Sequence, residues 1–175
     1  MKMADVGGLW LEIVTPQGIQ LKQRVDEVIA PSVDGEFGVL PGHLPMLAAL
    51  GIGLLHYRVG NKLTDVAVGT GFAEVLRNKA LIITDRFMEK RDIDVLAVRS
   101  RLKKVDAELD KWSGELDDPK RLQLIEEEQW LATQLELYGD PPQSKVLTHR
   151  LVDYSEVIPE VEDSSEEEES TEKHD

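Results

Sequence analysis

Apolar residues in the first half of the chain come in short runs, and several runs alternate with polar residues at a period of two. The runs are LWLEIV (9–14), VDEVIA (25–30), LLHYRV (54–59), LTDVAV (63–68), FAEVL (72–76) and ALIIT (80–84). Such alternation is typical of half-buried strands. Glycine- and proline-containing turn signals separate the runs, and none of the gaps is long enough for the helix of a parallel crossover. The pattern predicts an all-β domain over residues 1–88, an antiparallel β-sandwich or barrel.

The period changes after Arg86. No glycine or proline occurs from residue 87 to residue 113, and apolar residues recur there at spacings of 4, 3, 4 and 3: Val98, Leu102, Val105, Leu109 and Trp112. This spacing places them on one face of an α-helix. We expect Asp92 to cap the start of the helix and Gly114 to lie just beyond its end.

A second helix is predicted from Asp118–Pro119 to Gly139, because an N-cap acceptor followed by proline is a helix start and glycine before Pro141–Pro142 is a helix stop. Its apolar stripe is Leu124, Leu131, Leu135 and Tyr138. Two amphipathic helices joined by a short polar turn should form an antiparallel hairpin over residues 89–139. The hairpin has little core of its own, so we expect it to dock on the β domain or on a partner.

Residues 140–175 form a third zone. Residues 145–158 carry scattered apolar groups whose pattern assigns no element, and residues 159–175 include nine acidic residues and one lysine. Because like charges repel and nothing there could join a core, we expect a disordered acidic tail.

Composition excludes several classes of protein. The 175 residues include 34 acidic and 20 basic ones, a formal charge of -14, which disfavours nucleic-acid binding. The start of the chain lacks a long apolar segment and a small-residue cleavage site, so we expect no secretion, and no apolar run is long enough to cross a bilayer. With no cysteine there is neither a disulfide nor a thiolate zinc site, and the four histidines show no metal-ligand spacing, so no metal is expected.

The most enzyme-like cluster is Asp34 and Glu36 beside His43 in VDGEFGVLPGHLP. Two carboxylates and a histidine could serve a hydrolase. The alternative is that Asp34–Gly35 and Pro41–Gly42 are turns, with Phe37, Val39 and Leu40 entering the core and the polar residues facing water. We favour the turns, with a binding role for Glu36 and His43.

Other candidate sites are weaker. VGTGFAEV contains GxG, but a strand-like run follows it instead of a helix, and no phosphate-binding GxxxxGK[ST] loop occurs. Trp112 and Trp130 are expected in the hairpin core. The first helix carries four basic residues, which either contact phosphate or acidic side chains of a partner or solvate an exposed face: Arg99, Arg101, Lys103 and Lys104.

The order of parts and the wording of LEIVTPQG, VDEVIAPSVDGEFGVLPGHLPMLAAL and VAVGTGFAEV resemble the epsilon subunits of F-type ATP synthases. The resemblance covers residues 9 to about 112 and continues more loosely to Tyr138. It implies a β-sandwich of about ten strands followed by a helix-turn-helix.

The resemblance also implies a non-catalytic subunit of the central stalk, peripheral at the cytoplasmic face of the cell membrane. Its partners would be the gamma subunit and the c-ring, with the loop GEFGVLPGH facing the c-ring through Glu36 and His43. The hairpin of this family can extend along gamma to the alpha and beta subunits and block ATP hydrolysis.

Some members of this family bind ATP through a motif that runs Ile or Leu, Asp, two variable residues, Arg, Ala. This chain keeps Ile93 and Asp94 but has Ala97 where the motif arginine would stand. Alanine cannot replace a guanidinium as a phosphate partner, so we expect no cofactor and no ATP sensing. Asp94 would then serve as a helix-start acid.

Inhibition in the family also uses basic residues of the second helix against an acidic segment of the beta subunit. Here residues 119–138 carry a net charge of -2, so either the extended state is weak or Arg99, Arg101, Lys103 and Lys104 provide the contact. The alternative reading of the whole chain is a β-sandwich adaptor whose acidic tail binds basic partner proteins.

Overall fold

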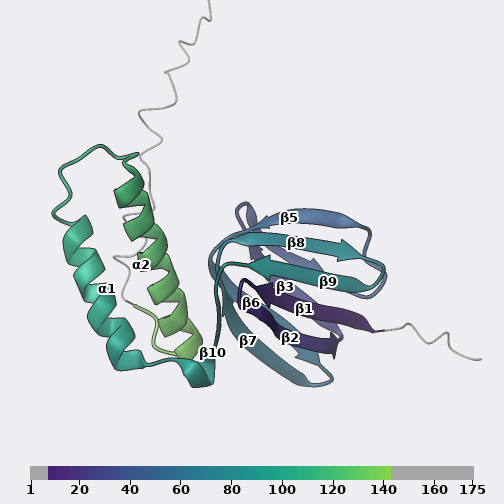
Figure 1. Cartoon of the computed structure of the whole chain (residues 1–175). Coiled ribbons are helices and arrows are strands. Elements are labelled where there is room, and N and C mark those ends of the chain that lie inside the picture. The colour runs from purple at the N-terminus through teal and green to yellow at the C-terminus, as the bar shows by residue number, and fades with distance from the viewer. Residues whose placement is uncertain (1–7, 143–175) are drawn as a thin grey trace, which may run out of the picture.

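The computed structural model describes residues 8–142, a β-sandwich of ten strands followed by two helices. Figure 1 shows helix α2 between helix α1 and the sandwich. The strands are β1 (Leu9–Thr15), β2 (Gly18–Val25), β3 (Glu27–Ser32), β4 (Gly35–Val39), β5 (Met46–Leu50), β6 (Gly53–Val59), β7 (Lys62–Val68), β8 (Gly71–Leu76), β9 (Lys79–Thr84) and β10 (Phe87–Glu89). A 3-10 turn (Lys90–Asp92) leads to α1 (Val95–Leu109) and α2 (Pro119–Tyr138). The predicted fold class, a β-sandwich with a helical hairpin, is confirmed.

The strands form one sheet that folds over on itself. Their order is β10-β7-β6-β3-β5-β8-β9-β1-β2, with β4 paired only to β3. A single residue pair, Ser32 with Leu50, joins β3 to β5, and this is where the sheet turns from one layer to the other. All pairs are antiparallel except β1 with β9, which is parallel. The predicted antiparallel pairing holds at every pair but this one; nearly the whole domain separates β1 from β9, so their parallel pairing needs no crossover helix.

The sandwich core consists of the inward-facing residues of both layers. Alternation in β1 buries Leu9, Leu11 and Ile13 completely, and Leu55 is likewise at 0% exposure. Close packing of such side chains is the main source of the domain's stability.

Two local predictions in the sandwich were wrong. The run 25–30 is not one strand, because the chain bends at Asp26, whose carboxylate accepts a hydrogen bond from the amide of Gly60 at 2.6 Å. Leu40 does not enter the core: it is 53% exposed, whereas Val39 is buried.

The first helix differs from its prediction at both ends. Asp94 is its N-cap, accepting a 3.1 Å hydrogen bond from the amide of Ala97, whereas Asp92 lies in the preceding 3-10 turn. The helix ends at Leu109, so Trp112 lies in the connection, where its indole donates to the carbonyl of Glu115. Trp112 is therefore outside the helical stripe in which the spacing had placed it.

The second helix follows its prediction closely. The side chain of Asp118 caps it by accepting from the amide of Lys120 at 2.8 Å, and Pro119 occupies the first turn. Gly139 ends it in the left-handed conformation, with φ of 98°, where glycine costs least.

Helix α2 packs on both sides. One face meets α1 around the cluster of Val98, Leu102, Val105, Leu109, Leu131 and Leu135. The other face meets β6 and β7. There the guanidinium of Arg86 lies 5.7 Å from the ring centroid of Trp130, and the ammonium of Lys90 lies 5.9 Å from that of Tyr138. Trp130 therefore belongs to the docking face and not to the hairpin core.

The predicted acidic tail lies outside the described residues. Within residues 8–142 neither helix has the length and apolar composition that a bilayer crossing requires.

Candidate functional site

The loop that carries His43 is held by backbone contacts. Gly42, with φ of 85°, donates its amide to the side-chain oxygen of Asn78 at 2.7 Å, and the amide of His43 donates to the carbonyl of Leu40 at 3.0 Å. Leu44 is 79% exposed and Leu40 is also exposed. Asn78 follows β8, which runs away from the helices, so this loop lies at the end of the sandwich far from the hairpin (Figure 1).

Glu36 is exposed near the other end of β4, next to the turn between β3 and β4. About 10 Å of extended strand separates it from Val39, and the His43 loop begins only beyond that residue. The structure therefore places the two predicted contact residues along one edge strand and not in one cluster.

Exposed apolar side chains gather on the outside of β5, β8, β9 and β1. Strand register places its members side by side: Phe72 is opposite Ile83 and Ala49, and Leu81 is opposite Glu74 and Glu12. We call this surface the outer apolar face, and its exposed large residues are Trp10, Leu47, Phe72, Leu76 and Ile83. An apolar patch of this kind on a small domain marks a protein-binding surface.

The carboxylate of Glu12, in the outer apolar face, is paired with two lysines. Glu12 contacts Lys79 at 3.2 Å and Lys22 at 3.4 Å. The hydrogen bond from Lys79 holds the pKa of the Glu12 carboxyl below its usual 4.5, and the charges of both lysines act in the same direction. Since its carboxylate already has partners, a neighbouring protein could cover this face without burying an isolated charge.

Sequence reasoning missed this face, although a signal for it exists. In ALIIT both the inward residues, Ala80 and Ile82, and the outward residues, Leu81 and Ile83, are apolar. Strands that are apolar on both sides belong to sheets covered on both faces. The core covers one face of β9, and the opposite face is exposed to solvent.

The structure gives the hydrolase reading no support. Asp34, Glu36 and His43 are all exposed, whereas a general acid needs a desolvated site. The described residues contain no group of histidines and carboxylates that could hold a metal ion.

The basic residues of α1 fall into two pairs. Arg101 donates two hydrogen bonds to Glu127 of α2, at 2.6 and 2.7 Å, and Arg99 is paired with Asp140 just beyond α2. The bond to Arg101 lowers the pKa of Glu127 below its ordinary 4.5. Lys103 and Lys104 are exposed. Both arginines therefore brace the hairpin in this conformation.

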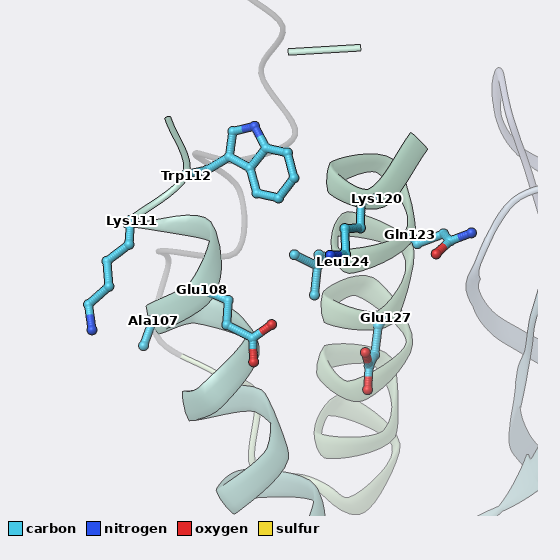
Figure 2. A pocket seen from close by; sticks show the side chains of 8 residues that line it. All are labelled: Ala107, Glu108, Lys111, Trp112, Lys120, Gln123, Leu124 and Glu127. Atoms are coloured by element: carbon cyan, nitrogen blue, oxygen red, sulfur yellow. The ribbon is translucent and has the colours of Figure 1, made fainter. Parts of the chain in front are cut away.

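A hollow of about 560 Å³ lies between the helices at the turn end of the hairpin. Figure 2 shows Glu108 of α1 projecting toward α2 and the indole of Trp112 above the gap, with Leu124 on the facing side. Lys111, Lys120 and Glu127 also line the hollow. This mixture of opposite charges defines no single class of ligand.

The remains of the nucleotide motif have structural roles. Ile93 packs against the hairpin core, and the Asp94 carboxylate caps α1. Ala97 lines a second hollow together with Arg86, Arg101 and Trp130. Of the two arginines there, Arg101 is held by Glu127.

Taken together, these features define a class: a protein-binding subunit with a rigid sandwich, a bare apolar face and a docked helical arm. Residues 9–90 match the sequence profile of the family described as ATP synthase, Delta/Epsilon chain, beta-sandwich domain. The chain is 41% identical over 109 residues to the ATP synthase epsilon chain of Nitratidesulfovibrio vulgaris strain DP4, covering 62% of this chain and 81% of that relative. It is 40% identical over 107 residues to that of Syntrophobacter fumaroxidans, covering 61% and 80%. The chain belongs to the family of ATP synthase epsilon chains.

A solved structure shares the fold. A chain in the OSCP/F1/c-ring part of the mitochondrial ATP synthase of Euglena gracilis superposes with a TM-score of 0.63 at 23% sequence identity, over 74% of this chain and 79% of that one. At this identity the likeness concerns architecture alone.

Proposed function

We propose that the chain is a non-catalytic central-stalk subunit of an F-type ATP synthase, coupling rotation of the gamma subunit and the c-ring to ATP synthesis. Family membership and the outer apolar face support this function, because a coupling subunit needs a rigid body with a surface shaped for a neighbour. As part of such a complex it would be peripheral at the cytoplasmic face of the cell membrane.

The outer apolar face is the proposed contact with gamma. Burying a charge in an apolar interface costs several kcal/mol, which is enough to prevent stable binding. We expect Leu47→Lys, on this face, to abolish co-purification of gamma with the chain. Leu63→Lys is the matched control, since Leu63 is also exposed but lies on β7 of the opposite layer. Equal recovery of gamma with both variants would refute the assignment.

The edge strand β4 is the proposed contact with the c-ring. Glu36 lies near one end of β4 and His43 lies in the loop that follows the other end, so both could meet a flat ring surface if β4 lay along that surface. Edge strands and exposed turns offer polar groups that can hydrogen-bond the polar loops of a neighbour.

Paired substitutions test this orientation. We expect Glu36→Gln with His43→Ala to impair assembly and ATP-driven proton pumping in reconstituted membranes. The control is Asp65→Asn with His56→Ala, which changes the same kinds of residue on strands that do not touch β4. Unchanged pumping with the first pair would remove Glu36 and His43 from the contact.

Inhibition of ATP hydrolysis by the hairpin is a further part of the proposal. An extended hairpin would reach the alpha and beta subunits through the basic residues of α1, and to do so Arg99 and Arg101 must leave Asp140 and Glu127. Lys103 and Lys104 need no such release, so they would make the first contact. Lys103→Glu with Lys104→Glu should raise ATP hydrolysis of the assembled complex, as should deletion of residues 114–175. No rise with either would exclude inhibition.

ATP is not expected to bind the folded hairpin. Arg101 is engaged by Glu127, and Ala97 supplies no guanidinium. Calorimetric titration of the chain with Mg-ATP should show no saturable heat, and a saturable signal would contradict this part of the proposal.

A further inference from the structure

Positive φ angles in the described part of the chain fall on glycine, with two exceptions. These are Arg77 and Asn78, with φ of 50° and 58°, which form the turn between β8 and β9. Two successive left-handed residues make the tight hairpin turn that matches the twist of its strands. Glycine, asparagine and aspartate adopt this conformation readily, whereas arginine is strained in it because its Cβ crowds the following carbonyl. The turn therefore contains one residue that its backbone conformation disfavours.

Asn78 has contacts that account for its place in the turn. Its side-chain oxygen accepts a hydrogen bond from the amide of Gly42 at 2.7 Å, and its carbonyl accepts one from the amide of Trp10 at 2.8 Å. Arg77 has no comparable contact. It is exposed, and its guanidinium forms no hydrogen bond, ion pair or ring contact with the residues that the structure describes. Backbone strain that local contacts do not explain is a reason to look for a binding role.

A hollow of about 400 Å³ opens beside this turn, at one end of the outer apolar face. Strand register places Lys79 of β9 between Trp10 of β1 and Leu76 of β8. The side chains that line the hollow come from these three strands and from the turn: Trp10, Glu74, Leu76, Arg77, Lys79 and Leu81. Apolar side chains that fill such hollows are the usual anchors of protein interfaces. The hollow therefore suits an apolar side chain of the protein that covers the outer apolar face.

The charges around the hollow favour a carboxylate at its turn end. The ammonium of Lys79 is already paired with Glu12 at 3.2 Å, which leaves Arg77 as the unpaired cation of the lining. The acidic residue of the lining, Glu74, precedes Arg77 by about 10 Å of extended strand. That separation exceeds the screening length of about 8 Å in physiological salt. A carboxylate beside Arg77 would therefore be attracted by the guanidinium and only weakly repelled by Glu74.

Resting on the proposed contact between the outer apolar face and gamma, we propose that this hollow receives one apolar side chain of gamma and that Arg77 binds a carboxylate beside it. A guanidinium can hold a carboxylate through two parallel hydrogen bonds, which adds geometric specificity to the apolar contact. The strain of arginine in the turn lowers the stability of the free chain, whereas its charge stabilises the complex.

Opposite effects on stability and binding test this role. In Arg77→Asn the turn gains a residue that tolerates the left-handed conformation, so the urea midpoint of the isolated chain should rise. Binding to a complex of alpha, beta and gamma subunits that lacks this chain should weaken by about tenfold or more, as biolayer interferometry would measure. The difference should shrink at high salt. Unchanged affinity would overturn the proposal, and so would a loss of affinity accompanied by a lower urea midpoint.

Two further variants separate this proposal from the function on which it rests. Lys62→Asn removes an exposed cation at the start of β7, in the opposite layer, and should leave binding unchanged. Leu47→Lys should abolish binding. If Leu47→Lys has no effect, the contact with gamma is refuted and the role of Arg77 with it. If Leu47→Lys abolishes binding but Arg77→Asn binds like the wild type, or no worse than Lys62→Asn, the role of Arg77 alone is refuted.

Carbodiimide cross-linking identifies the occupant. A guanidinium does not form an amide with an activated carboxylate, but the amine introduced by Arg77→Lys does, so the wild-type chain is the control. In the whole complex in membranes, mass spectrometry of this variant should show an amide link from residue 77 to an aspartate or glutamate of gamma. A link to the c-ring instead, or no link from residue 77, would overturn the proposal.

Discussion

The sandwich and the hairpin are stabilised in different ways. Leu9, Leu11, Ile13 and Leu55 of the sandwich are completely enclosed between two layers of sheet. The hairpin core is a single seam of six residues, and all but Val105 retain between 3% and 7% exposure. A seam of that size cannot hold two helices rigidly without further contacts. The sandwich is therefore the fixed body, and the hairpin depends on what it packs against.

The docking face of α2 supports the same distinction. Thr133 and Gln134 are buried there, but their side chains hydrogen-bond the carbonyls of Gln129 and Trp130 in their own helix. When α2 leaves the sandwich, these bonds persist, so separation exposes surface without breaking them. Such an interface suits an arm that is released and recaptured.

The largest expected effect on stability comes from replacing a glycine of the sandwich, Gly71, by alanine. At Gly71 a Cβ would stand 1.9 Å from the backbone oxygen of Ile83, and φ there is 153°, whereas a Cβ at Gly38 meets nothing within 4 Å. We expect Gly71→Ala to lower the free energy of unfolding by about 4 kcal/mol. Gly38→Ala should change it by about 0.5 kcal/mol or less. Urea denaturation followed by circular dichroism measures both free energies. A similar stability of the two variants would show that β8 and β9 can move apart at little cost in free energy.

The second effect is local to the hairpin. Leu131→Ala removes a side chain from the seam and should destabilise the hairpin by about 2–3 kcal/mol. Hydrogen exchange should rise in α1 and α2 but stay unchanged in the sandwich strands. Leu122→Ala, at a half-exposed position of the same helix, should do little. If exchange rose equally in the sandwich, the two regions would be one cooperative unit.

The sequence predicted best what depends on local chemistry. Proline after Asp118 and glycine after Tyr138 determine both ends of α2 regardless of tertiary contacts. The first helix was harder, because Asp92 and Asp94 are both good caps. Because residues 90–92 form a 3-10 turn that includes Asp92, Asp94 is the N-cap of α1.

Features that depend on distant pairing could not be predicted. The parallel pairing of β1 with β9 and the exposure of Leu40 follow from how the sheet closes. The spacing of apolar residues along the sequence does not determine that closure. For the same reason Glu36 and His43, which share the motif GEFGVLPGH, turned out to be separated by most of β4, with His43 in the loop beyond it. The outer apolar face was visible in ALIIT, but recognising it required knowing which side the core covers.

The third effect is the contribution of Glu127 to the pH dependence of the hairpin. Because Arg101 holds the folded-state pKa of Glu127 below 4.5, the pair stabilises the hairpin above that pH. The stabilisation is lost as the pH falls through the folded-state pKa. Helical circular dichroism of the wild-type chain should therefore melt at a lower temperature at pH 3 than at pH 6. In Glu127→Gln this difference should shrink, whereas Glu126→Gln should retain it. An unchanged difference in Glu127→Gln would assign the acid sensitivity to other carboxylates.

The smallest effect concerns docking alone. Arg86 over Trp130 joins the sandwich to α2, while Arg24 lies over Trp10 at 5.8 Å within the sandwich. A cation–π contact at a partly exposed site contributes about 0.5–1 kcal/mol, so Arg86→Gln should raise the undocked fraction of the hairpin about 2–5-fold. In the chain labelled with fluorotryptophan, the ¹⁹F signal of Trp130 should shift and that of Trp112 should not. Arg24→Gln should move only the Trp10 signal. If Arg86→Gln leaves the Trp130 signal in place, the apolar contacts of Leu137 and its neighbours hold the arm without help from the arginine.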